Sequence, residues 1–215
     1  MPGLFITLEG VDGGGKTTQI ARLASWLTGL GARVVVTEEP GGTPLGQAIG
    51  EWLRGRGAEQ PVARAEALLF LAARAQHVDT VIAPALADGA VVICSRFSHS
   101  TLAYQCAGLG LDEPAVRAAD ALARAGLWPD VVLVLDLAPH MAAARRAGRG
   151  GEADAIEARA AAFHARVREG FARLAAEDPP RVKLIAAGDE PDAVHAAIRM
   201  ALAPALTAWQ AGAAP

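Results

Sequence analysis

Short apolar runs alternate along this chain with longer segments in which apolar residues recur every three or four positions. The runs are rich in valine, leucine and isoleucine and are bounded by glycine, proline or charged residues, which is typical of buried strands. Strands that alternate with helices predict an α/β fold with three layers, α/β/α, around a five-stranded parallel sheet. The expected strands are residues 4–8, 33–37, 90–94, 131–136 and 182–186.

Helix boundaries are indicated at several places between these strands. Pro61 starts a long helix that bends or ends near Pro84, because proline fits the first turn of a helix and disrupts its interior. Residues 112–114, an Asp-Glu-Pro sequence, are a typical helix start. Residues 155–176 have helical apolar spacing that includes Ile156, and we expect them to form one amphipathic helix.

The segment after the first strand is a phosphate-binding loop. Residues 10–17 read GVDGGGKT, which matches GxxxxGK[ST] at every fixed position. In this motif the glycines let backbone N–H groups surround a polyphosphate, Lys16 reaches the β- and γ-phosphates, and the Thr17 hydroxyl holds Mg²⁺. Helical spacing from Lys16 to Leu30 places a helix N-terminus at the loop, which favours an anion. The residues expected to bind ATP are Gly10, Val11, Asp12, Gly13, Gly14, Gly15, Lys16, Thr17 and Thr18.

Length, composition and charge limit the classes of protein and ligand. We expect a single domain over residues 1–210, with a lid segment at about 145–155 and a frayed tail at 211–215. The net charge is −3 and there is no basic tract, so nucleic acid binding has no electrostatic support, whereas a small phosphorylated substrate is compatible. A signal peptide and a membrane-spanning run are not recognisable, so we expect a cytoplasmic protein without a membrane partner. Of the two cysteines, Cys94 lies in an apolar run and is expected to be a core residue rather than half of a disulfide.

The residues around the strand ends occur in an order that resembles the thymidylate kinase family. A phosphate loop alone is shared by many nucleotide-binding proteins, whereas the ordered set, spread from Phe5 to about residue 200, is much more specific. The resemblance implies a nucleoside monophosphate kinase-like fold, ATP-dependent phosphorylation of dTMP to dTDP, Mg²⁺ as cofactor and a homodimer. Beside the phosphate loop, the motifs are Glu9-Gly10-Val11-Asp12, Glu39-Pro40-Gly41-Gly42-Thr43, Phe70-Leu71-Ala72-Ala73-Arg74, Arg96-Phe97, Ser100-Thr101-x-Ala103-Tyr104-Gln105, Pro129-Asp130 and Asp154-x-Ile156-Glu157.

The resemblance also implies a nucleoside pocket. Phe70 is similar to the residue that stacks on the thymine ring, and Arg74 to its hydrogen-bonding partner at a carbonyl oxygen. Thr101 and Gln105 resemble polar groups of the base pocket, and Tyr104 resembles the ring that lies against the deoxyribose and disfavours a 2′-hydroxyl. Without the resemblance, each has a plainer explanation: Phe70 as core, Arg74 as a solvated helix residue and Tyr104 as a packed ring. Arg96, Ser100, Glu39 and Pro40 complete the expected substrate-binding set.

The reacting phosphates are expected to be surrounded by basic residues. Arg96 resembles an arginine at the acceptor phosphate, and Asp12 an acceptor for the sugar 3′-hydroxyl or for a bound water. Since Gly13 and Gly14 leave the phosphate loop without a basic residue, the chain resembles the bacterial type, in which lid arginines close over the transferring group. The alternative for these arginines is a solvated basic helix end. The lid arginines are Arg145, Arg146 and Arg149, and the expected catalytic set is Lys16, Asp12, Arg96, Arg149 and Arg145.

Three residues depart from the family pattern, all at the expected reaction centre. Glu38 stands where the family has an arginine that binds the acceptor phosphate, which reverses the sign of the interaction. Ser95 replaces an aspartate that organises Mg²⁺, and Ala155 replaces a lid arginine. Three explanations are open: the enzyme is slow, another residue compensates, or the acceptor has changed.

Two alternatives to a dTMP kinase therefore stay open. One is a paralogous kinase that acts on another or a modified nucleoside monophosphate, which Glu38 favours. The other is a nucleotide-binding protein with little catalysis, which Ser95 and Ala155 favour, although Lys16, Thr17 and the lid arginines argue against it.

Overall fold

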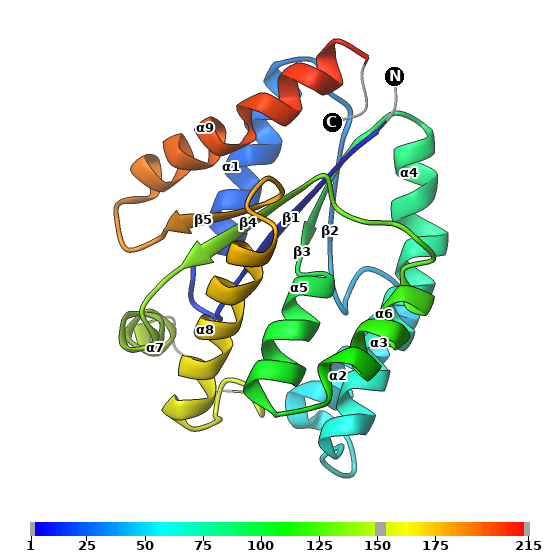
Figure 1. The fold of residues 1–215 in the computed structure, drawn as a ribbon, viewed down its shortest axis with the longest axis vertical. Helices are drawn as coiled ribbons and strands as arrows, with labels where there is room; N and C mark the ends of the chain where they lie inside the picture. Colours follow the sequence, from blue (N-terminus) through cyan, green and yellow to red (C-terminus); the bar gives the residue numbers. More distant parts are fainter. Residues whose placement is uncertain (1–2, 149–153, 213–215) are drawn as a thin grey trace.

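Residues 3–148 and 154–212 are described in this computed structural model. They form a parallel sheet with helices on both faces (Figure 1), as the alternating pattern predicts. The strand order is β2-β3-β1-β4-β5, so the first strand is central. Each strand lies within two residues of its predicted bounds. The strands are β1 (Leu4–Gly10), β2 (Val34–Glu38), β3 (Val91–Ser95), β4 (Val131–Asp136) and β5 (Val182–Ala186).

Helices pack on both sides of this sheet (Figure 1). Helices α1 and α9 contact each other and cover one face, while α4, α5 and α8 pack on the other. Helices α2, α3 and α6 extend beyond the sheet on the side of β2. The helices are α1 (Lys16–Gly29), α2 (Pro44–Glu51), α3 (Ala63–His77), α4 (Ala83–Ala87), α5 (Ser98–Thr101), α6 (Glu113–Ala123), α7 (Pro139–Gly148), α8 (Ala161–Glu177) and α9 (Pro191–Gln210), with π-helical turns η1 (Trp52–Arg56), η2 (Val78–Ile82) and η3 (Leu102–Gly108).

Two predicted helix starts match the structure closely. Asp112 caps α6, where its side chain accepts a hydrogen bond from the Ala115 N–H. The helix expected from Pro61 begins at Ala63, and the π-helical turn η2 interrupts the α-helical pattern just before Pro84. Both prolines therefore act near the positions that the sequence indicated.

The prediction of one helix over residues 155–176 is wrong for its first six residues. Oδ1 of Asp154 accepts hydrogen bonds from the N–H groups of Ile156 (2.9 Å) and Glu157 (2.8 Å), which folds this segment into a turn. Such a local side-chain bond offers the backbone an alternative to the helix. Ala160 is extended, and α8 starts only at Ala161. Ile156 still packs on the main core, so the prediction that it faces the interior is confirmed, whereas the prediction that it lies in a helix is wrong.

The core explains how the site is positioned. Every residue of β1 is buried, and the main core joins its Leu4, Ile6 and Leu8 to α1, α8 and α9. Because β1 is packed between neighbouring strands and helices, the position at which the phosphate loop begins is fixed. Both cysteines are buried and free, as expected for Cys94. Among the described residues, no helix is long and apolar enough to cross a membrane.

Candidate active site

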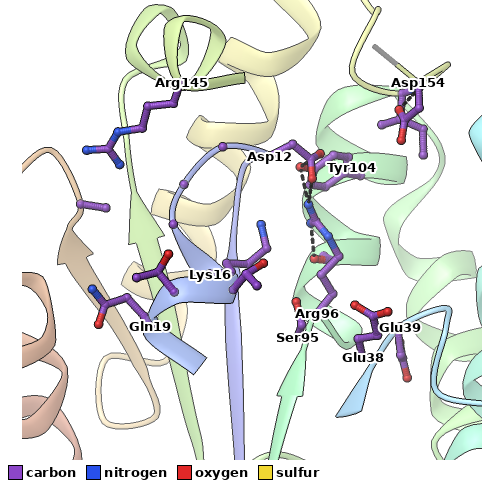
Figure 2. Close-up of a pocket in the computed structure, with 18 of the residues that line it drawn as sticks. Asp12, Lys16, Gln19, Glu38, Glu39, Ser95, Arg96, Tyr104, Arg145 and Asp154 are labelled. Carbon is purple, nitrogen blue, oxygen red and sulfur yellow. Dashed lines mark hydrogen bonds and ion pairs between the residues drawn. The ribbon is translucent and has the colours of Figure 1, made fainter. Parts of the chain in front are cut away.

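A cavity of about 810 Å³ opens beyond the carboxyl ends of the strands (Figure 2). This is the edge at which open α/β sheets bind their ligands. The phosphate loop, the ends of β2 and β3, α3, η3, α7 and the loop before α9 all contribute to its walls. All of the described residues predicted to bind ATP or substrate line this cavity, except the buried loop residues Gly10 and Val11. The residues that line the cavity and were predicted from sequence are Asp12, Gly13, Gly14, Gly15, Lys16, Thr17, Thr18, Glu39, Pro40, Phe70, Arg74, Arg96, Ser100, Thr101, Tyr104, Gln105 and Arg145.

The phosphate loop owes its shape to glycine. Gly10 has a φ of +118°, and a β-carbon there would lie 2.5 Å from the carbonyl oxygen of Leu135 in β4. Gly15 also has a positive φ, +92°, immediately before α1. Other residues rarely adopt such angles without strain. The loop therefore turns sharply at the end of β1 and brings the N-terminus of α1 to the cavity.

Lys16 is held over this loop. Its Nζ donates hydrogen bonds to the carbonyl oxygens of Gly10 and Val11, both at 3.0 Å. The side chain is almost fully buried and points up through the loop toward Asp12 (Figure 2). A cation in this position, among the backbone N–H groups of the loop, suits the phosphates of a nucleotide.

Asp12, Arg96 and Tyr104 form a linked cluster beside Lys16 (Figure 2). Nη2 of Arg96 donates to Oδ1 of Asp12 at 2.6 Å and to the Tyr104 hydroxyl at 3.2 Å, and the Tyr104 hydroxyl donates to Oδ2 of Asp12 at 3.1 Å. Burial by itself disfavours the charged carboxylate, but Arg96 and Lys16 outweigh burial and hold the pKa of Asp12 below its ordinary value. Arg96 has a positive φ of 69°, which is unusual for a residue with a side chain. The cluster thus fixes an arginine at the floor of the cavity.

A buried carboxylate supports Arg96 from below. Glu9 accepts a hydrogen bond from the Phe97 N–H at 2.8 Å, and its other oxygen accepts one from the Ser100 hydroxyl. Ser100 in turn accepts a bond from Nη1 of Arg96 at 3.1 Å. Burial raises the pKa of Glu9 to about 7, although Ser100 and Arg96 oppose the shift. Sequence reasoning placed Glu9 in a motif but missed that it organises the segment after β3.

Arg74 belongs to a second buried network. Its side chain is 1% exposed, and it donates to Oε2 of Glu39 at 3.0 and 2.7 Å and to Oδ1 of Asp120 at 2.5 Å. Nη2 also bonds the Thr101 hydroxyl at 3.0 Å. These pairs explain why Arg74 is not a solvated helix residue. Asp120 was not recognised from sequence, because its partner lies 46 residues earlier in the chain.

The α3 side of the cavity has a further polar contact that the sequence did not reveal. Gln105 donates from Nε2 to Oε1 of Glu66 at 3.0 Å, and Arg159 forms an ion pair with the same carboxylate. Phe70 is partly buried and lines the cavity on α3. Glu66 therefore links α3, η3 and the segment before α8 around the pocket.

Comparison with known proteins agrees with this geometry. The family model described as thymidylate kinase matches residues 8–198. This chain belongs to the thymidylate kinase family. Similar curated relatives are the thymidylate kinases of Chromohalobacter salexigens, 45% identical over 209 residues, and of Pelotomaculum thermopropionicum, 46% identical over 212 residues. These matches cover 97% and 99% of this chain, and 99% and 98% of the relatives.

A solved structure from the same family has the same fold. The crystal structure of thymidylate kinase from Ehrlichia chaffeensis superposes with a TM-score of 0.77 at 32% sequence identity. The match covers 94% of this chain and 99% of that one. The family resemblance and the nucleoside monophosphate kinase-like fold expected from the motifs are confirmed.

Two of the three departures from the family pattern sit where two neighbouring strands end. Glu38 and Ser95 are the last residues of β2 and β3, they are register partners, and both line the cavity. Figure 2 shows the Glu38 carboxylate beside Ser95 and Glu39, below Arg96. Ala155 lies elsewhere, where its N–H donates to the Arg54 carbonyl at 3.4 Å. The replacements at positions 38 and 95 are therefore neighbours in space.

The expected lid is described only in part. Arg145 projects from α7 at the rim of the cavity, far from Arg96, and Nη2 lies 3.5 Å from the Gly188 carbonyl oxygen (Figure 2). Arg149 and the side chain of Arg146 lie outside the described part of the structure. Asp154, at the other end of this segment, lines the cavity on the side of Tyr104.

Proposed function

We propose that this chain transfers the γ-phosphoryl group of ATP to the 5′-phosphate of dTMP and so forms dTDP. The observation that carries the proposal is one cavity whose walls combine a phosphate loop with a pocket of aromatic, arginine and hydroxyl side chains. Donor and acceptor phosphates held in one such cavity react without a general base, because the acceptor phosphate is already ionised at neutral pH.

The phosphate groups meet between Lys16 and Arg96. Lys16 stabilises negative charge on the donor phosphates, and Arg96 offers a fork of donors to the acceptor phosphate. Asp12 holds Arg96 at 2.6 Å, so the guanidinium is oriented before substrate binds. Arg145 and Arg149 act as lid arginines that close over the transferring group and exclude water.

Magnesium fits the donor chemistry of this site. Thr17 lines the cavity beside the phosphate loop, and Mg²⁺ is commonly held by a few protein oxygens together with substrate phosphates. When bound with ATP, Mg²⁺ neutralises charge on the β- and γ-phosphates. We propose Thr17 as one of its ligands.

The nucleoside is bound on the α3 side of the cavity. Phe70 stacks on the thymine ring, while Thr101 and Gln105 contact its polar edge. Arg74 donates a hydrogen bond to the Thr101 hydroxyl at 3.0 Å and contacts the base next to Thr101. Its buried ion pairs also make it a structural residue. Tyr104 is buried against Phe163 and lies against the deoxyribose, where its ring leaves no room for a 2′-hydroxyl.

We also propose a homodimer in the cytoplasm, built on a single domain over residues 1–210. Val62 before α3, Leu68 on α3 and Leu122 on α6 are exposed apolar residues, and α3 packs beside α6. Exposed apolar side chains on neighbouring helices are suited to a second copy. Size-exclusion chromatography with light scattering tests this: a dimer mass supports the proposal and a monomer mass at micromolar concentration overturns it.

Steady-state release of ADP tests the activity. We expect ADP formation that depends on dTMP and is much slower with dUMP, dCMP, dAMP and UMP. Faster turnover with another monophosphate would instead support a paralogous kinase. If the protein binds ATP but forms no ADP with any of these monophosphates, it is a nucleotide-binding protein with little catalysis.

A further inference from the structure

Thr17, Glu38 and Ser95 gather oxygen atoms at one corner of the active-site cavity. All three line the main cavity, and they also share the lining of a smaller hollow between α1 and the ends of β2 and β3. Neighbouring strands lie only about 4.8 Å apart, and register partners of parallel strands present their side chains on the same face. Glu38 and Ser95 are such partners, so a carboxylate on β2 reaches the space beside the Ser95 hydroxyl.

Glu38 forms no ion pair with any residue that the structure describes. The arginines that line the cavity near it are engaged: Arg74 by Glu39 and Asp120, and Arg96 by Asp12. Solvent tolerates this exposed carboxylate while the cavity is empty. Once polyphosphate occupies the neighbouring loop, an unneutralised carboxylate repels it, and a divalent cation between the two removes the repulsion.

We propose that Glu38 is the protein carboxylate that binds the magnesium ion of the nucleotide in this chain, in the place of an acidic residue at position 95. The donor set fits, because a carboxylate and two hydroxyls supply the oxygen atoms that Mg²⁺ prefers. The backbone around Glu38 also leaves space for the carboxylate. A β-carbon at Gly41 would lie 2.9 Å from Oε1 of Glu38, so a larger residue at position 41 would crowd it.

The inference rests on the proposed function, since it assumes a nucleotide polyphosphate at the loop. It explains the departures at 38 and 95 as one exchange, in which a negative charge has moved from the end of β3 to the end of β2. Loss of the arginine and loss of the aspartate are then not two independent defects. The site keeps one carboxylate beside Thr17.

Calorimetric titration with a non-hydrolysable ATP analogue, in excess magnesium and in excess chelator, tests this without turnover. The neutral isostere Glu38→Gln is expected to bind the analogue more tightly than wild type in chelator, because a repulsive charge is gone. In magnesium it is expected to bind more weakly. The dissociation constant in chelator divided by that in magnesium is expected to fall by about ten-fold or more, because even a group that only supports a metal ligand contributes about ten- to a hundred-fold.

Glu190→Gln is the matched control. Glu190 is also an exposed carboxylate that lines the cavity, but it precedes α9 at the opposite edge of the sheet from β2. We expect the same magnesium ratio as wild type. The double variant Glu38→Gln/Ser95→Asp, which returns the charge to β3, is expected to recover most of the ratio.

The proposal is overturned if Glu38→Gln changes analogue affinity equally with and without magnesium, since Glu38 then acts only as a charge near phosphate. If the double variant has the same ratio of dissociation constants as Glu38→Gln, the idea that the carboxylate has moved from position 95 to position 38 is overturned. Neither result concerns the acceptor. Failure of wild type to phosphorylate dTMP would reject the proposed function and leave the magnesium ratio measurable.

Discussion

Replacement of Arg74 by leucine is expected to destabilise the whole domain. Arg74 is 1% exposed and neutralises two buried carboxylates, Glu39 at 2.7 Å and Asp120 at 2.5 Å. Glu39 would lose its arginine, and Asp120 would keep only Arg124, whose Nε lies 3.5 Å away. Removing one partner of a buried ion pair typically costs about 3–5 kcal/mol, because the remaining charge is uncompensated. Against a total stability of about 5–15 kcal/mol, this is a large fraction.

Urea denaturation followed by circular dichroism measures the effect. We expect Arg74→Leu to lower the free energy of unfolding by about 3–5 kcal/mol. Arg117→Leu is the matched control, since Arg117 pairs with Glu113 and Glu177 but is 41% exposed. An exposed pair contributes about 0–1 kcal/mol, so the control is expected to unfold nearly as wild type does.

A second variant separates charge from packing. Arg74→Leu/Asp120→Asn removes one of the two stranded charges, and we expect it to recover part of the lost stability. If Arg74→Leu costs no more than Arg117→Leu, the buried pairs do not stabilise the fold as argued. A double variant that is less stable than Arg74→Leu would also refute the reasoning.

Three further predictions concern the site. Lys16→Ala is expected to abolish dTDP formation with an unchanged unfolding curve; retained activity would reject the phosphate-loop role. Phe70→Ala is expected to raise the dissociation constant of dTMP by about ten- to a hundred-fold, a stacking contribution of about 1–3 kcal/mol, and to leave an ATP analogue bound nearly as before; equal calorimetric losses for both ligands would contradict this. Glu9 has a pKa of about 7 against an ordinary 4.5, so its contribution to stability is complete below pH 4.5 and is lost as the pH rises through 7. Between pH 4.5 and pH 7 the free energy of unfolding of wild type is expected to fall by about 3 kcal/mol more than that of Glu9→Gln. Parallel profiles of unfolding free energy against pH would show that Glu9 is not buried as described.

The parts of the molecule that could be predicted are those that local pattern determines. Each strand is a short run of mostly apolar residues, and the loop over residues 10–17 needs glycine where φ is positive, so both are visible in a few consecutive residues. The ordered motifs then placed Arg96, Tyr104 and Phe70 at one cavity, and the structure brings them there. A resemblance that spans the chain explains this success better than any single motif.

The parts that could not be predicted depend on partners distant in sequence or on local competition. Arg159, in the segment before α8, meets Glu66 of α3 across 93 residues, and no local periodicity indicates the pair. Without the family resemblance, Arg74 has the plain explanation of a solvated helix residue, because its partner Asp120 lies on another helix. Before α8, apolar spacing suggested helix, but the Asp154 side chain bonds the backbone and produces a turn.

Transfer of label from γ-³²P-ATP tests the central claim most directly. Purified protein is mixed with labelled ATP, dTMP and magnesium, and the products are separated over a time course. The account predicts label in dTDP, formed in equal amount with ADP, and almost none in inorganic phosphate. Label that appears only as inorganic phosphate, or that stays in ATP while dTMP is present, would contradict it.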